Sequence, residues 1–249
     1  MNIDELAIKN NTDKSSLDHN YTVFYQKYFD KYVNNPKKIL ELGIYTTTNS
    51  FDLETSGASL KTWSEYFPES EIYGLDLSDF TVLDNNYKNI HTLPCNTEIR
   101  ANGDAYKLKN PWLVEIFTNP KYNYIGGNFG LEEIINKFGG DFDVIIDDGP
   151  HTMSGQQIFL GYMFKHLKSG GVFVIEDLCT SDISKWGPSY NSYPMTDKTT
   201  LWMIKYYIKH KKILTDFMLE EEIKYLEENI SEMYLETANN SEIAFIIKK

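Results

Sequence analysis

Two pairs of acidic residues each follow an apolar run in the middle of the chain. Asp147 and Asp148 end one run, Glu176 and Asp177 end the next, and His151 comes three residues after Asp148. Carboxylates are the ligands that Mg²⁺ and Mn²⁺ prefer, and a neutral imidazole can accept a proton near neutral pH. Because charge is costly inside a core, four acids at the ends of buried strands indicate the rim of a binding crevice.

These residues also have an ordinary structural explanation. Strand ends and turns are often rich in Asp for backbone reasons, and His151 would then be a helix N-terminal residue bonded to backbone. A single acidic cluster would favour that explanation. Two clusters on neighbouring strands, one of them in the pattern Asp-x-x-His, favour a functional site instead. His19 and His91 are weaker candidates.

The composition restricts the classes of protein to consider. A length of 249 residues, with 41% hydrophobic and 14% aromatic residues, suits one large α/β domain. The formal net charge of -12 disfavours a nucleic-acid partner, because phosphate binding needs concentrated Lys and Arg. Cys95 and Cys179 have no ligand-type spacing, so neither a disulfide framework nor a zinc site is indicated. The chain has no pattern of a signal peptide or a membrane span, which predicts a cytoplasmic protein without a membrane partner.

Strand-like and helix-like segments alternate along the chain. Strands are expected within 37–45, 70–78, 141–149 and 171–178. Helices are expected at 59–67, 152–171, 195–212 and 220–230. The last segment, 231–249, reads as a hairpin that turns at Asn239 and Asn240. This order predicts an α/β fold with a doubly wound, mostly parallel sheet and a C-terminal antiparallel hairpin.

Ligands of such sheets bind beyond the carboxyl ends of the strands, where Glu41 and Asp76 join the acids already named. A nicotinamide enzyme is expected to carry Gly-x-Gly-x-x-Gly after its first strand. Here Gly43 is followed by "IYTTT", and a P-loop is also missing. The motifs "ELG" after the first strand and "LDLS" after the second suit a nucleoside without a pyrophosphate.

The sequence resembles class I S-adenosylmethionine-dependent methyltransferases, and more closely the metal-dependent sugar O-methyltransferases of the mycinamicin and macrocin type. The motifs that carry the resemblance are "NNTDKSSLDHNYTVFYQKYF", "ILELGI", "SLKTWSEYFP", "IYGLDLS", "NGDAY", "DDGPH" and "IEDL". Each is weak alone, but together and in this order they are fairly specific and cover nearly the whole chain. The resemblance implies a seven-stranded, Rossmann-like methyltransferase domain at 37–249, with a helical arm at 1–36 that folds over the cofactor.

The resemblance also implies roles for individual residues around S-adenosylmethionine. Glu41 and Gly43 would lie against its methionine part, Asp76 would bind the ribose hydroxyls, and Asp104 with Ala105 would face the adenine. A carboxylate suits a ribose diol because it can accept two hydrogen bonds at once. Further cofactor contacts are expected from Lys14, Tyr21, Ser59 and Asp147.

A long polar connection at 45–58 departs from the family pattern, in which a short Gly-rich turn follows the first strand. We expect it to form a loop over the carboxyl edge of the sheet. It leaves open which backbone groups bind the carboxylate of the cofactor, with Gly57 and Ser59 as candidates.

In the family pattern, Asp148, Glu176 and Asp177 hold the metal and His151 is the general base. An oxygen-only ligand set favours Mg²⁺, or Mn²⁺ in its place, over zinc or copper. A sugar hydroxyl hardly ionises at neutral pH, but a divalent cation lowers its pKa and a neutral imidazole can then take the proton.

The sequence therefore predicts a metal-dependent sugar O-methyltransferase. Its acceptor would be a nucleotide-activated sugar, such as a precursor of a capsule or other surface polysaccharide, or a larger glycoside. Two alternatives stay open, namely a non-catalytic cofactor-binding protein and a hydroxylase-type enzyme on the same scaffold. One histidine beside several acids differs from the two histidines of an iron facial triad. Relatives in the family are often oligomers, which is compatible with a homo-oligomer.

Overall fold

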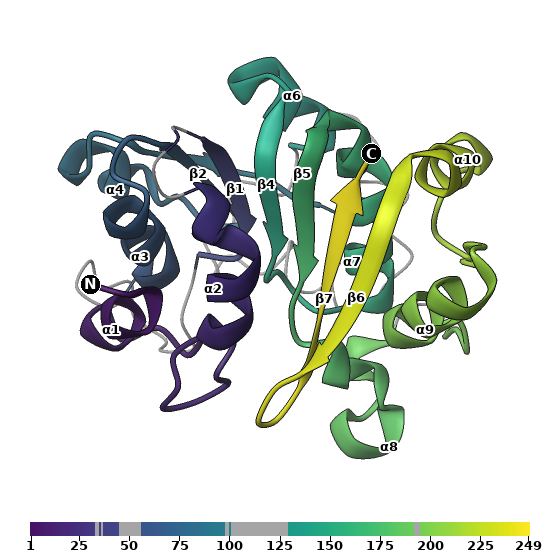
Figure 1. The fold of residues 1–249 in the computed structure, drawn as a ribbon. Helices are drawn as coiled ribbons and strands as arrows, with labels where there is room; N and C mark the ends of the chain where they lie inside the picture. The colour runs from purple at the N-terminus through teal and green to yellow at the C-terminus, as the bar shows by residue number, and fades with distance from the viewer. Residues whose placement is uncertain (33–34, 36, 45–55, 98–99, 101–128, 192–194) are drawn as a thin grey trace.

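The computed structural model has a central β-sheet with helices on both faces (Figure 1). It describes residues 1–32, 35, 37–44, 56–97, 100, 129–191 and 195–249. Seven strands in this part of the chain form one sheet in the order β3-β2-β1-β4-β5-β7-β6. The strands are β1 (Lys38–Leu42), β2 (Glu71–Asp76), β3 (Ile90–Pro94), β4 (Phe142–Asp147), β5 (Leu167–Ile175), β6 (Ile230–Thr237) and β7 (Glu242–Lys248).

The pairing of the strands follows the predicted pattern. Neighbours from β3 to β5 are parallel, whereas β7 runs antiparallel to both β5 and β6. The β6–β7 turn is closed by a hydrogen bond from the Ala238 amide to the Ser241 carbonyl, 2.8 Å long. The predicted doubly wound α/β fold with a C-terminal antiparallel hairpin is confirmed.

Different parts of the chain cover the two faces of the sheet (Figure 1). One face packs against α1 (Ile3–Lys9), α2 (Thr22–Phe29), α3 (Ala58–Tyr66) and α4 (Thr81–Asn86). The other face packs against α6 (Leu131–Phe138), α7 (Met153–Met163), α9 (Thr200–His210) and α10 (Glu220–Asn229). A further short helix, α8 (Ile183–Trp186), follows β5.

The burial of strand β4 explains why the acids at its end lie where a ligand can reach the sheet. Val144 and Ile146 belong to the apolar cluster on one face, and Ile145 belongs to the cluster on the other. The strand is buried along its whole length because helices cover both faces of a parallel sheet. A polar ligand therefore reaches this strand only at an end. No helix among the described residues combines the length and apolar character that a membrane crossing requires.

The predicted helix at 152–171 is wrong at its C-terminal end. Helix α7 ends at Met163, a 3₁₀ turn follows at Phe164–His166, and β5 already begins at Leu167. Leu167 pairs with Phe142 of β4, and the register then shifts before Val172 pairs with Val144. The Gly170/Gly171 pair therefore lies in an irregular part of the strand rather than at a helix end.

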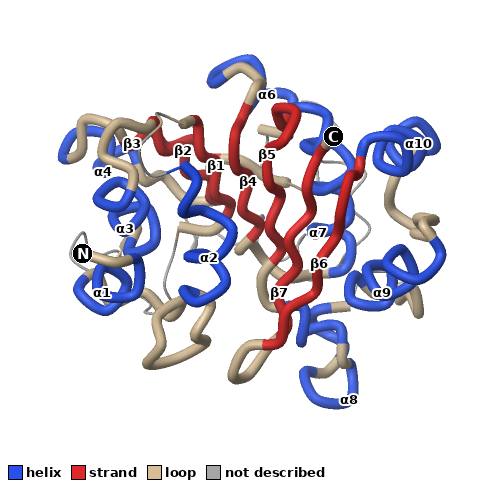
Figure 2. Tube along the Cα trace, in the orientation of Figure 1, coloured by secondary structure: helices blue, strands red, loops and turns tan. Residues whose placement is uncertain are grey.

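β1, β4 and β5 lie side by side in the tube view (Figure 2), and because they are parallel their carboxyl ends meet at one edge of the sheet. Gly43 follows β1 at this edge, between the end of β2 and the turn after β4. The Asp148 amide donates to the Leu42 carbonyl at 2.9 Å, and the Gly43 amide donates to the Leu75 carbonyl at 2.8 Å. Gly43 has φ +95°, and a Cβ there would lie 1.9 Å from the Asp148 carbonyl oxygen. Only glycine fits this close approach.

Replacing Gly43 with alanine should therefore destabilise the fold by about 3 kcal/mol, from backbone strain and overlap together. Gly170→Ala is the matched control, because Gly170 has φ +75° but no atom within 4 Å of an added Cβ. This control should lose only about 1–2 kcal/mol. Urea denaturation of both variants measures the difference, and equal losses would contradict the close contact.

Candidate functional site

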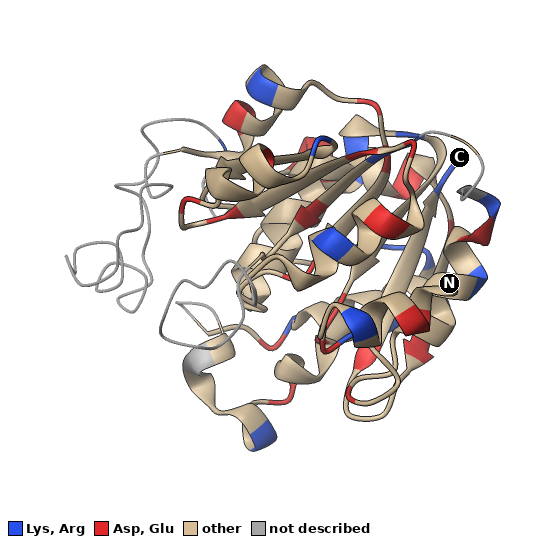
Figure 3. Ribbon diagram, turned by 90° about the vertical axis from the view of Figure 1, so that its left-hand side faces the viewer, with Lys and Arg blue, Asp and Glu red and all other residues tan. Residues whose placement is uncertain are grey.

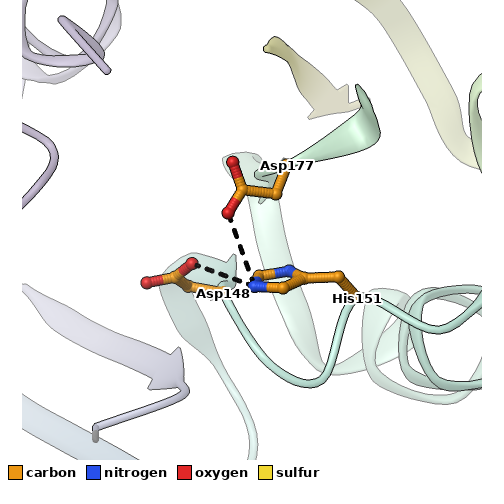
Figure 4. A group of neighbouring side chains, drawn as sticks. All are labelled: Asp148, His151 and Asp177. Carbon is orange, nitrogen blue, oxygen red and sulfur yellow. Dashed lines mark ion pairs between the residues drawn. The ribbon is translucent and has the colours of Figure 1, made fainter. Parts of the chain in front are cut away.

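Asp148, His151 and Asp177 come together beyond the ends of β4 and β5 (Figure 4). His151 Nε2 lies 3.4 Å from Asp177 Oδ2 and 3.9 Å from Asp148 Oδ1. One ligand atom from each residue lies within 4.8 Å of the others, a grouping that could hold a metal ion. About a fifth of each side chain is exposed, at 19% for the two aspartates and 20% for the histidine, so solvent reaches the group.

Backbone strain accompanies this cluster. His151 has φ 54° and Asp177 has φ 50°, both in the left-handed region that non-glycine residues rarely adopt. The Thr180 hydroxyl lies 3.1 Å from the His151 carbonyl and 2.9 Å from the Asp177 carbonyl, and it links the two turns. Strained residues of this kind concentrate at functional sites, where the surrounding structure fixes them.

A buried lysine lies behind the exposed cluster. Lys14 Nζ is 2.5 Å from Asp148 Oδ2, 2.9 Å from Glu176 Oε2 and 3.5 Å from Glu41 Oε1. Burial by itself would lower the pKa of Lys14, but the charges of these carboxylates outweigh it and raise the pKa well above its ordinary value. Lys14 is therefore an internal cation shared by the ends of β1, β4 and β5.

Both carboxylate oxygens of Glu176 already have partners. Oε2 accepts from Lys14, and Oε1 accepts from the Tyr25 hydroxyl. Burial and the nearby Asp148 carboxylate raise the pKa of Glu176 well above its ordinary value. Of the three metal ligands that the sequence predicts, Asp148 and Asp177 thus lie beside His151, whereas Glu176 is directed to Lys14 and Tyr25. Its role as a ligand stays a prediction.

Asp177 is kept ionised by its neighbours. The Tyr21 hydroxyl donates to Asp177 Oδ1 at 2.6 Å. Burial by itself would raise the pKa of Asp177. The charge of His151 and the hydrogen bond from Tyr21 lower the pKa by more than burial raises it, so the pKa of Asp177 lies below its ordinary value. Burial raises the pKa of Asp148 despite the opposing effect of Lys14. Asp177 therefore offers the cluster an ionised carboxylate, which is the kind of ligand that a divalent cation needs.

The residues predicted to bind the cofactor fall into two groups, of which the first lies along the same edge of the sheet. Glu41 is fully buried, accepts a 2.8 Å hydrogen bond from Trp63 Nε1 and interacts with Ser59, while burial raises its pKa to about 7. Asp76 accepts bonds of 3.1 Å from the Ile44 amide and 3.0 Å from the Ser78 amide. Asp76 therefore ties the turn after β1 to the end of β2.

Asp147 belongs to the same group. Burial raises its pKa to about 7, and its Oδ2 has no hydrogen-bond partner within the described part of the chain. A buried polar atom of this kind is compatible with a ligand contact. The predicted adenine contacts, Asp104 and Ala105, and most of the connection 45–58 lie outside the residues that the structure describes.

The second group is the N-terminal pair. Lys14 and Tyr21 contact the acids of the rim, and their contact with the cofactor stays a prediction. Tyr25 and Thr180 were not identified from the sequence. Tyr25 carried one usable signal, because it lies four residues after Tyr21 and so on the same face of a helix. Thr180 offers no such signal, since its contacts depend on how two turns meet.

Comparisons with known proteins give the family setting. No family model matches the chain. A Streptomyces olivaceus protein named 8-demethyl-8-(2-methoxy-alpha-L-rhamnosyl)-tetracenomycin-C 3'-O-methyltransferase is 31% identical over 182 residues, which cover 73% of this chain and 38% of the relative. The L-olivosyl-oleandolide 3-O-methyltransferase of Streptomyces antibioticus is 29% identical over 82% of this chain and 44% of its own length. The chain thus spans less than half of these curated relatives.

A solved structure, the MycE methyltransferase of the mycinamycin biosynthetic pathway in complex with Mg and SAH, superimposes with a TM-score of 0.69. It is 25% identical, and the match covers 100% of this chain and 54% of that one. This chain has the class I methyltransferase fold. The predicted resemblance to the sugar O-methyltransferases is confirmed in both sequence and structure.

The buried ion pairs of this methyltransferase fold predict a large effect of removing Lys14. Lys14→Met would leave Asp148 and Glu176 without their cation, and losing one partner of a buried pair typically costs about 3–5 kcal/mol of folding free energy. The matched control is Lys27→Met, because Lys27 pairs with Glu236 while its side chain is 59% exposed. The control should lose much less, because solvent screens an exposed pair. Urea denaturation at pH 7 compares them, and similar losses would count against a buried cation.

Proposed function

We propose that the protein is an S-adenosylmethionine-dependent O-methyltransferase that methylates a hydroxyl of a sugar, at a site that also holds Mg²⁺ or Mn²⁺. The observation that carries the proposal is the cluster of Asp148, His151 and Asp177 at the carboxyl rim of a methyltransferase sheet. The named activities of the relatives support it, because these proteins are sugar O-methyltransferases. The relatives are more than twice as long as the matching region, so the activity is inferred for this chain.

The donor set fits a hard divalent cation. Asp148 Oδ1 and Asp177 Oδ2 face His151, and Asp177 is held ionised. These two carboxylates would hold the ion, with Glu176 as a third ligand if it exchanges its present partners. When bound, such an ion acts as a Lewis acid that makes a nearby alcohol more acidic. One histidine with two carboxylates differs from the iron facial triad, which disfavours the hydroxylase alternative.

Cofactor binding is assigned to the edge that runs from β1 to β4. We propose that Glu41, Gly43 and Asp147 contact the methionine part of S-adenosylmethionine and that Asp76 binds the ribose. The raised pKa values of Glu41 and Asp147, each about 7, suit groups that meet a positively charged sulfonium or ammonium. Ser59, which interacts with Glu41, would then orient that carboxylate. Binding at this edge follows the general rule for open parallel sheets.

His151 would act as the general base. Its Nε2 points to the space between the two aspartates, where a sugar hydroxyl would approach, and Asp177 at 3.4 Å would stabilise the imidazolium that forms. The proton moves from the hydroxyl to His151 Nε2. The oxygen then forms its bond to the methyl carbon while the carbon–sulfur bond breaks, and the bonding electrons remain on sulfur. Alignment of the oxygen, methyl carbon and sulfur supplies the rest of the rate.

The acceptor is proposed as a sugar carried by a nucleotide or by a larger glycoside. The relatives act on sugars attached to antibiotic cores, according to their names. Basic residues are scattered over the helices in the view of Figure 3, and they form no continuous stripe among the residues drawn there. The acceptor class is therefore to be decided by assay. A panel of nucleotide-activated sugars and glycosides, with radiolabelled S-adenosylmethionine, would identify the methylated product.

Replacing His151 with glutamine should lower turnover about 10²–10⁴-fold, the usual contribution of a general base. The affinity for S-adenosylhomocysteine, measured by calorimetry, should stay within about twofold of wild type, because His151 lies beyond the proposed cofactor edge. His91→Gln is the matched control, since His91 lies on β3 and pairs with the exposed Glu71 of β2. Retained turnover in His151→Gln would show that His151 is not the general base. Cofactor binding without any methylated sugar would favour the non-catalytic alternative.

A further inference from the structure

Residues 14–25 contact every acid that the sequence predicts as a metal ligand. Tyr21 donates to Asp177 at 2.6 Å, and Lys14 contacts Asp148 at 2.5 Å and Glu176 at 2.9 Å. Tyr25 donates to the other oxygen of Glu176. The contacts come from residues more than a hundred positions away in sequence, so they exist only in the folded chain.

These contacts give the two oxygens of each aspartate different partners. In Asp177, Oδ1 accepts from Tyr21 while Oδ2 faces His151 at 3.4 Å. In Asp148, Oδ2 contacts Lys14 while Oδ1 faces His151 at 3.9 Å. One oxygen of each carboxylate is therefore fixed from behind, and the other is directed into the exposed cluster of Figure 4. Hydrogen bonds of this kind orient the groups that coordinate a metal.

We propose that Lys14, Tyr21 and Tyr25 are positioning residues for the ion site and that they set which carboxylate oxygens face the ion. This inference rests on the divalent ion of the proposed function. It gives Lys14 and Tyr21 a role on the metal side of the crevice rather than the cofactor contact implied by the family resemblance. Tyr25, four residues after Tyr21, joins them because its hydroxyl contacts Glu176.

The segment is rigid enough for this role. Tyr21, Tyr25 and Phe29 are fully buried at 0% exposure, and the Tyr25 ring packs edge-on against Trp63, 4.9 Å between centroids. The His19 ring stacks on Tyr21 at 5.1 Å with an interplanar angle of 13°. Because the rings are packed, the two hydroxyls have little freedom to leave their carboxylates.

Two further contacts fix the turn before α2. The Asn239 amide and side chain, in the β6–β7 hairpin, donate to the backbone carbonyls of His19 at 3.3 Å and Asp18 at 2.9 Å. On the other side, the Thr22 hydroxyl donates to Asp4 Oδ1 at 2.7 Å, and the Ser16 amide donates to the same oxygen. The turn is thus tied to both the C-terminal hairpin and α1.

The charge balance supports a positioning role for Lys14. Four carboxylates, those of Glu41, Asp148, Glu176 and Asp177, lie at this end of the sheet with one buried ammonium among them. Lys14 partly neutralises the inner group, which keeps Glu176 and the rear oxygen of Asp148 in place. The outer oxygens, Asp148 Oδ1 and Asp177 Oδ2, face His151 instead, and a single divalent ion would be bound there.

Tyr21→Phe tests the inference, because it removes the hydroxyl and keeps the buried ring. Titration of Mn²⁺ in the presence of S-adenosylhomocysteine, followed by electron paramagnetic resonance of the free ion, should give a Kd about 10–100-fold higher than wild type. The Kd of S-adenosylhomocysteine without metal should stay within about twofold of wild type. Tyr25→Phe should also weaken Mn²⁺ binding, because Glu176 without its bond to Tyr25 would no longer hold Lys14 against the rear oxygen of Asp148.

Tyr28→Phe is the matched control. Tyr28 lies on the same helix, and its hydroxyl bonds to Glu236 at 2.9 Å, away from the rim, so its Mn²⁺ affinity should be unchanged. If Tyr21→Phe and Tyr25→Phe both bind Mn²⁺ like wild type, the positioning role is wrong while the proposed function stands. If Tyr21→Phe instead loses S-adenosylhomocysteine affinity, the residue contacts the cofactor and the inference is overturned. If the wild-type protein does not bind Mn²⁺, both the divalent ion of the proposed function and the positioning role inferred from it are wrong.

Discussion

Mutual repulsion among carboxylates at one edge of a buried sheet is the constraint on which the rest of this structure depends. A parallel sheet covered on both faces leaves only its strand ends for polar chemistry, so acids from β1, β4 and β5 converge there. Burial of such a group raises the free energy of the ionised forms unless cations lie nearby. Lys14 provides one positive charge from within the chain. The outer oxygens of Asp148 and Asp177 face His151 instead, and this arrangement is the physical reason for proposing a divalent ion.

The architecture was largely predictable because it depends on local patterns. Apolar runs that end in or near acids predicted β1, β2, β4 and β5, and the Asn239–Asn240 pair predicted the hairpin, whereas no pattern located β3. The start of β5 was not predictable, because helix-like spacing continues to His166 and only pairing with β4 makes Leu167 extended. The local sequence does not show whether this segment continues as a helix or pairs with β4 as a strand.

The site was predictable in composition but only partly in geometry. The sequence places Asp148, His151 and Asp177 at neighbouring strand ends, and they do meet. It does not show that Glu176 is directed to Lys14 and Tyr25, because that depends on side-chain direction and on contacts between residues far apart in sequence. The left-handed conformations of His151 and Asp177 are equally invisible in the sequence, since neither residue is a glycine.

The longer relatives show how much of a methyltransferase this chain corresponds to. The match to the MycE structure covers 54% of that chain, and the methyltransferase sheet lies within it. Within the described part of this chain, the first 25 residues are already integrated with the sheet, since they contact the acids, α3 and the C-terminal hairpin. On the proposed mechanism, chemistry at the rim depends on this N-terminal segment as much as on the strands.

The central claim is that the carboxylates of the rim bind one divalent cation between Asp148 and Asp177. Crystals grown with S-adenosylhomocysteine and saturating Mn²⁺ test it most directly, through the anomalous scattering of manganese. The account predicts a single peak within bonding distance of Asp148 Oδ1 and Asp177 Oδ2. A peak elsewhere on the protein, or none at saturating Mn²⁺, would contradict it.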